Sequence, residues 1–104
     1  MQKVAFKMFL HKGFEEEYTR RHADIWPELK SLLTATGITD YAIFLDKETL
    51  QLTGVLTIAD AKKLDELPNH PIMQKWWLYM ADIMQTNGDH SPVSIPLEQV
   101  FYLP

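Results

Sequence analysis

The sequence predicts an α+β fold, in which a four-stranded antiparallel sheet carries helices on one face. Three observations support this prediction. The chain has 104 residues, enough for one domain with one hydrophobic core. Hydrophobic residues make up 46% of it and charged residues 23%, as in globular domains. Its apolar periodicity changes in the order strand, helix, strand, strand, helix, strand. We therefore expect a single domain over residues 1–104.

The first strand and the first helix differ in the spacing of their apolar residues. Residues 4–10 alternate, which is typical of a strand. From Phe14 the spacing becomes helical, and glutamates at 15–17 fill the first turn, where the helix dipole favours negative charge. Tyr18 and His22 fall on another face, one helical turn apart, so both side chains project from the same side of the helix.

A second helical segment is expected directly afterwards. Asp24 is its expected N-cap, Pro27 is tolerated in its first turn, and Gly37 is a natural stop. Leucines between the last two supply the apolar stripe. Trp26 and Pro27 are interpreted as structural residues that fix the turn between the two helices.

The middle of the chain predicts a β-hairpin. Residues 41–45 and 50–58 are rich in β-branched and apolar side chains, and the polar residues 46–49 join them. Residues 60–70 are expected to form a short helix or turn. The hairpin supplies the second and third strands of the sheet.

The last third contains a long helix, a loop and a strand. Apolar residues recur at helical spacing over 72–84, while 85–96 is rich in turn residues and 97–103 has strand composition. The segment from Asn87 to Pro96 is a candidate cover for a functional site, in its own chain or in a partner.

This order of elements is the ferredoxin-like arrangement. Two helices cover one face of such a sheet, and the sequence places apolar side chains on the other face as well. A second copy of the chain is the simplest cover for that face. We therefore expect a homodimer packed sheet to sheet.

Composition argues against several functional classes. The net charge of −4 and the absence of a basic stripe argue against nucleic acid as a partner. The chain has no cysteine, which excludes disulfides and thiolate catalysis and fits a reducing compartment. No apolar run approaches the roughly 18 residues of a membrane helix. We expect a cytoplasmic protein without a membrane partner. None of the four histidines has metal-ligand spacing, so no metal is expected.

Five residues are candidates for a site that performs proton transfer. Histidine exchanges protons near neutral pH, and His22 has Tyr18 as its helical neighbour. Trp76 and Trp77 lie on the other long helix, and Tyr41 opens the second strand. Indoles, phenols and one imidazole suit a sugar, whose C–H face stacks on a ring while its hydroxyls take hydrogen bonds. The competing interpretation is that the tryptophans and the Tyr18–His22 pair belong to the core.

The whole chain resembles the L-rhamnose mutarotase family. The motifs that carry the resemblance are "EEYTRRHADIWPEL", "YAIFLDKETLQL", "WWLYMADIM", "SPV" and the terminal "VFYLP". The resemblance implies a single mutarotase domain, assembled as a dimeric α+β barrel, that interconverts the α and β anomers of L-rhamnose without a cofactor. It implies His22 as the proton donor and Tyr18, Tyr41, Trp76 and Trp77 as substrate contacts. For Tyr18 we further expect an orienting or proton-relaying role.

Anomer exchange requires the pyranose ring to open, so that the anomeric hydroxyl loses a proton while the ring oxygen gains one. We expect His22 to protonate the ring oxygen. Two alternatives stay open: a cofactor-free monooxygenase of the same dimeric barrel superfamily, and a non-catalytic sugar-binding domain.

Overall fold

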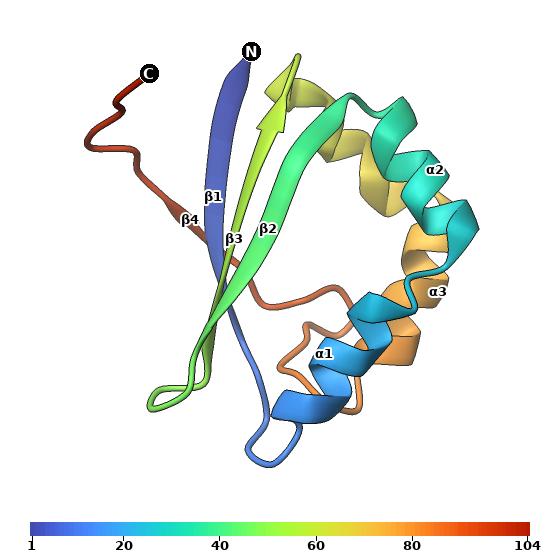
Figure 1. Cartoon of the computed structure of the whole chain (residues 1–104). Coiled ribbons are helices and arrows are strands. Elements are labelled where there is room, and N and C mark those ends of the chain that lie inside the picture. Colours follow the sequence, from blue (N-terminus) through green and yellow to red (C-terminus); the bar gives the residue numbers. More distant parts are fainter.

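The structure is a computed structural model that describes all 104 residues. In chain order its elements are β1 (Gln2–Phe9), α1 (Glu15–Ala23), α2 (Pro27–Ala35), β2 (Ile38–Asp46), β3 (Gln51–Ile58), the 3₁₀ helix η1 (Ala61–Asn69), α3 (Pro71–Met80) and β4 (Ile95–Leu97). The strands form one antiparallel sheet in the order β2-β3-β1-β4. Figure 1 shows every helix on the same side of this sheet. The predicted α+β, ferredoxin-like fold is confirmed.

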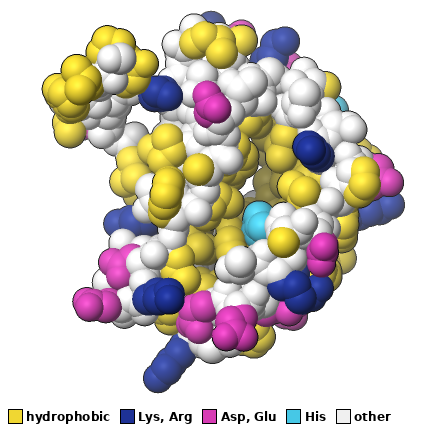
Figure 2. Space-filling view, in the orientation of Figure 1, with side chains coloured by type: hydrophobic (Ala, Val, Ile, Leu, Met, Phe, Trp, Pro, Cys, Tyr) yellow, Lys and Arg dark blue, Asp and Glu magenta, His cyan; other side chains and the backbone are white.

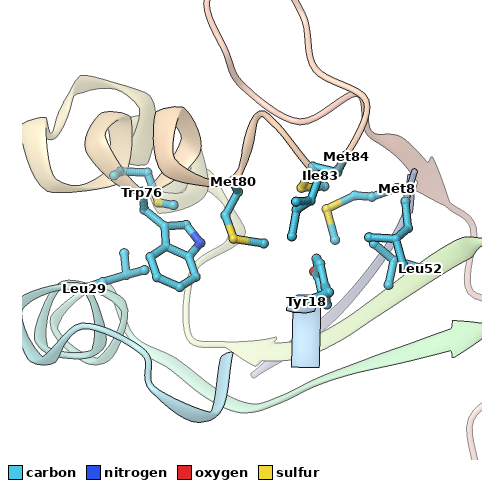
Figure 3. Close-up of a cluster of buried hydrophobic side chains, with 10 residues drawn as sticks. Met8, Tyr18, Leu29, Leu52, Trp76, Met80, Ile83 and Met84 are labelled. Atoms are coloured by element: carbon cyan, nitrogen blue, oxygen red, sulfur yellow. The ribbon is translucent and has the colours of Figure 1, made fainter. Parts of the chain in front are cut away.

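The core lies between the inner face of the sheet and the helices. Its main cluster joins side chains of β1, β3, all three α-helices and the segment after α3: Met8, Leu10, Tyr18, Leu29, Leu52, Met73, Trp76, Met80, Ile83 and Met84. Figure 3 shows Trp76 beside Leu29 at one end of this cluster, with Met8 and Leu52 at the other end. Tyr18 therefore belongs to the core as well as to the face that the sequence marks as functional.

Arg21 fastens α1 to the end of α3. Its side chain is buried, and it donates hydrogen bonds to the Tyr79 carbonyl at 2.7 Å, to Asp82 at 2.9 Å and to Glu17 at 2.7 Å. The guanidinium also lies 4.3 Å from the centre of the Tyr79 ring. These contacts fix the position of α1 relative to α3. They also fix the position of His22, because it is the residue after Arg21.

The predicted N-cap of the second helix is wrong. Asp24 terminates α1, whereas Trp26 occupies the position before α2 and makes no capping hydrogen bond with its side chain. Pro27 at the first position of α2 explains the difference, since its ring presets the helical φ and leaves one fewer N–H group to cap.

Two boundaries near the C-terminus also differ from expectation. Helix α3 ends at Met80 rather than 84, because Ile83 and Met84 turn to meet the end of β1, where the Ile83 carbonyl accepts a hydrogen bond from the His11 amide at 2.9 Å. The predicted strand 97–103 is instead β4, Ile95–Leu97, and residues 98–104 have no regular structure. Strand β4 is an edge strand with only three paired residues, so it does not hold the following segment in the sheet.

The outer face of the sheet is uncovered. Phe44 of β2 and the β4 residues Ile95 and Leu97 are exposed there, because they pair in register with residues that point away from the helices. The C-terminal segment 98–104 leaves the sheet on the side away from the helices (Figure 1), and its large apolar side chains are exposed. No helix has the length and hydropathy needed to cross a membrane.

Candidate functional site

A cavity of about 960 Å³ lies between the inner face of the sheet and the helices. Figure 2 shows it as a hollow with hydrophobic walls and a histidine beside it. The structure brings all five residues predicted from sequence to the wall of this cavity: Tyr18, His22, Tyr41, Trp76 and Trp77. They come from α1, from β2 and from α3, so the site exists only in the folded chain.

His22 is held in one tautomer by the backbone of its own helix. Its Nδ1 lies 3.0 Å from the carbonyl oxygen of Tyr18. A carbonyl only accepts hydrogen bonds, so Nδ1 carries the proton and Nε2 is left with its lone pair in the neutral ring. Burial lowers the pKa of His22, against the smaller raising effect of this backbone hydrogen bond. The ring is therefore neutral at pH 7, and its Nε2 is a base.

Tyr18 and Tyr41, the two phenols of the site, are held in their protonated form. The ring of Tyr18 stacks on His22 with 4.3 Å between ring centres. Burial, together with the nearby phenol of Tyr41, raises the pKa of Tyr18. Burial of its hydroxyl end raises the pKa of Tyr41 to about 12, although 39% of that residue is exposed. Both hydroxyls stay protonated at neutral pH and can donate hydrogen bonds.

The tandem tryptophans have different environments. Trp76 is buried and packs edge to face on His22 at 5.4 Å and on Trp26 at 5.0 Å between ring centres. It therefore belongs to the core and to the cavity wall at once. Trp77 is half-buried and lines the same cavity, but its ring has no aromatic partner.

Trp26 has a structural role beyond the turn that the sequence suggests. It stands behind Trp76 and stacks on Tyr79, with 5.4 Å between ring centres. Tyr79 in turn carries the guanidinium of Arg21. The contacts therefore form a closed series. Trp76 at one end packs on His22, and Arg21 at the other end is the residue before His22.

The floor of the cavity depends on a glycine in the sheet. Gly54 of β3 pairs with Phe6 of β1, and the Phe6 ring lies so close that a Cβ on Gly54 would be 2.5 Å from its Cζ. Phe6 lines the cavity and meets Tyr41 edge to face at 6.2 Å. An isolated glycine within a strand pattern is the sequence signal for such close packing.

Polar residues that sequence reasoning missed complete the lining. Lys30 and Thr34 from α2 and Asp40 from β2 lie at the cavity, as do Ser91 and Ser94 of the loop before β4. The segment 87–96 thus covers part of the cavity in its own chain. No spacing pattern marks these residues, because short polar side chains in a loop are the ordinary composition of turns.

The fold and the cavity define a ferredoxin-like α+β protein with an open cavity where a neutral imidazole and two phenols meet. A sequence profile for L-rhamnose mutarotase matches residues 3–103. An L-rhamnose mutarotase from Brucella anthropi is 55% identical over 103 residues, which cover 99% of this chain and 97% of that protein. Another from Bacteroides thetaiotaomicron is 52% identical over 99% of each chain. The crystal structure of an L-rhamnose mutarotase from Formosa agariphila superposes with a TM-score of 0.93 at 48% identity and covers both chains completely.

This chain belongs to the L-rhamnose mutarotase family.

Proposed function

We propose that this protein is an isomerase that interconverts the α and β anomers of L-rhamnose by opening and closing the pyranose ring. Family membership supports the reaction. The observation that carries the mechanism is His22, held neutral with a free Nε2 in a cavity that it shares with two protonated phenols.

His22 can serve both oxygens that exchange a proton. The anomeric hydroxyl and the ring oxygen are bonded to the same carbon, so one Nε2 reaches each of them with little movement. The neutral imidazole first takes the proton of the anomeric hydroxyl. The resulting imidazolium then gives that proton to the ring oxygen as the C–O bond breaks. This second half is the donor role expected from sequence.

After the ring opens, rotation about the C1–C2 bond presents the other face of the aldehyde. Closure repeats the same transfers in reverse, as microscopic reversibility requires. No electron is transferred, and no bond to the protein forms. The phenols of Tyr18 and Tyr41 donate hydrogen bonds to sugar oxygens, and the stacking of Tyr18 on His22 orients the imidazole.

Trp77 is the better of the two tryptophans to stack on the sugar ring, since its indole is half-buried and has no aromatic partner. Trp76 is fixed by His22, Trp26 and Tyr79, and it presents an edge to the substrate. This division reconciles the core interpretation of the tandem tryptophans with the sugar-binding one.

The reaction is tested directly by magnetisation-transfer NMR on L-rhamnose at anomeric equilibrium. Saturating the α-anomer H1 signal reduces the β-anomer signal at a rate set by exchange. We expect added protein to raise this rate in proportion to its concentration. If added protein does not raise the exchange rate but still binds L-rhamnose in calorimetry, the protein is a sugar-binding domain and not an enzyme. Oxygen consumption with polycyclic aromatic substrates would instead support the monooxygenase.

We further propose that the protein is a cytoplasmic homodimer whose partners meet through the uncovered sheet face. The exposed side chains Phe44, Ile95 and Leu97 and the apolar segment 98–104 support this assembly. Large apolar side chains exposed on a sheet face are typical of protein–protein contact surfaces. The absence of cysteine supports the reducing compartment.

A further inference from the structure

Strand β2 contains an irregularity at the cavity. Thr39 pairs with Thr57 and Ala42 pairs with Val55, so two residues of β2, Asp40 and Tyr41, stand opposite the single residue Leu56. This is a β-bulge, in which one extra residue is inserted into one strand of an antiparallel pair. Leu56 is buried and lines the cavity.

The bulge lies in the part of β2 that borders the cavity. Four consecutive residues line the cavity there, Ile38, Thr39, Asp40 and Tyr41, whereas side chains in a regular strand alternate between faces. Asp40 has a φ of 49°, in the left-handed region. That conformation disfavours residues with a Cβ, and strained backbone of this kind is concentrated at functional sites.

Asp40 is an exposed residue of the cavity lining, and its carboxylate has no partner within the chain. The carboxylates of Asp46, Asp60 and Asp89 accept hydrogen bonds from nearby amides and so explain their own positions in turns. Asp40 takes part in none of the side-chain hydrogen bonds or ion pairs of the structure. It is also the only carboxylate among the residues that line the cavity.

We propose that Asp40 is a specificity-determining residue whose carboxylate accepts hydrogen bonds from two neighbouring hydroxyls of the sugar. The proposal rests on the proposed function, because it assigns a part of L-rhamnose to a part of that cavity. L-Rhamnose carries three adjacent secondary hydroxyls and a terminal methyl group. The two oxygens of one carboxylate match a pair of adjacent hydroxyls, and such charge-assisted bonds are stronger than neutral ones.

This arrangement meets a requirement of the reaction. Ring opening needs C1 to turn, so the sugar has to be held elsewhere. Asp40 lies on the sheet side of the cavity, whereas His22 lies on α1. Holding the hydroxyls that are not on C1 leaves the anomeric carbon free beside the imidazole.

Two substitutions separate this role from the backbone role of Asp40. Asp40→Gly removes the carboxylate and relaxes the left-handed φ, because glycine adopts it freely. Asp40→Asn keeps the size and the tolerance of that φ but removes the charge. A matched control carries the same change of charge away from the cavity: Asp65→Asn, on the exposed face of η1.

The test measures thermal melting, L-rhamnose binding by calorimetry, and kcat and KM by magnetisation transfer. The protein does not consume the sugar, since it only equilibrates two anomers, so binding is measurable on active protein. Loss of hydrogen bonds to a charged group typically weakens binding about 10- to 100-fold. We expect that rise in Kd and KM for Asp40→Gly, a smaller rise for Asp40→Asn, and none for the Asp65→Asn control. Asp40→Gly should melt no lower than the unaltered protein.

A Kd for Asp40→Gly within about threefold of the unaltered protein would overturn the proposal, because Asp40 would then serve the backbone alone. That failure is distinct from failure of the proposed function. In the latter case the unaltered protein itself would not raise the exchange rate.

Discussion

His22 is the residue on which the proposed chemistry depends most. Replacing it with alanine removes Nε2, the atom that carries the proton. We expect His22→Ala to reduce kcat for anomer exchange by about 10²- to 10⁴-fold, the usual contribution of a general acid–base group. Magnetisation transfer on L-rhamnose measures the loss, and a thermal melt establishes that the variant is folded. If folded His22→Ala kept more than about a third of the rate, another group would carry the proton.

The pH dependence follows from the sign of the His22 shift. The neutral ring is the working form, and burial lowers the pKa of His22 below its ordinary value of about 6.5. We therefore expect kcat/KM to be constant from pH 7 to 9 and to fall on acidification only below pH 6.5. Ionisation of the phenols does not lower kcat/KM in that range, since the pKa of Tyr41 is about 12.

Protein-free samples at each pH supply the spontaneous exchange rate to be subtracted. Circular dichroism at each pH verifies the fold. A catalysed rate that increases between pH 7 and 5.5 would contradict this expectation, because the imidazolium would then be the working form.

The tandem tryptophans should separate stability from binding. Trp76→Ala removes a buried indole that packs on three aromatic rings, and we expect a loss of about 3–5 kcal/mol in the free energy of unfolding. Trp77→Ala should cost less stability and raise KM about 3- to 10-fold through lost stacking. Denaturant titrations and exchange kinetics measure the two effects. An unchanged KM for Trp77→Ala would place the stacking surface elsewhere.

At the scale of elements, the packing of β1 on β3 sets the depth of the cavity. A methyl group on Gly54 would meet the Phe6 ring at 2.5 Å, and this ring of the cavity lining would have to move. We expect Gly54→Ala to cost about 1–3 kcal/mol in the free energy of unfolding, the usual effect of overpacking. It should also weaken L-rhamnose binding in calorimetry. Gly88→Ala is the matched control for stability, because nothing lies within 4 Å of its added Cβ.

Elements with strong periodicity were predictable from sequence, and their boundaries were less so. The alternation in β1 and β3 and the apolar spacing of α3 are local properties, so the four strands and the helices were expected in the right order. The end of α3 and the short β4 depend on tertiary contacts with β1. Local patterns do not contain that information.

The residues of the site also differ in whether the sequence alone predicts their contribution. The pairing of Tyr18 with His22 follows from helical spacing, so the sequence alone marks it. The contribution of Asp40 requires a bulge whose position depends on the register of β2 against β3. The tautomer of His22 likewise depends on the folded helix, because it is set by a backbone carbonyl rather than by any side chain.

At the scale of the whole molecule, the uncovered sheet face predicts association. We expect sedimentation at micromolar concentration to give about twice the 12.1 kDa mass of the chain. Phe44→Glu should yield a monomer, because a carboxylate in a closed apolar interface has no partner. Leu78→Glu is the control: this residue is 60% exposed, against 64% for Phe44, but it lies on α3. A monomer mass for the unaltered protein would exclude the dimer.

The aromatic wall built on α3 has a practical consequence. The chain contains three tryptophans, and all of them belong to the cavity wall or pack directly behind it. Intrinsic fluorescence therefore reports on this one region, with no background from distant indoles. When a sugar ring displaces water from Trp77, the emission of that indole should shift to shorter wavelength. A stopped-flow instrument could then follow each binding event in the native protein without a label.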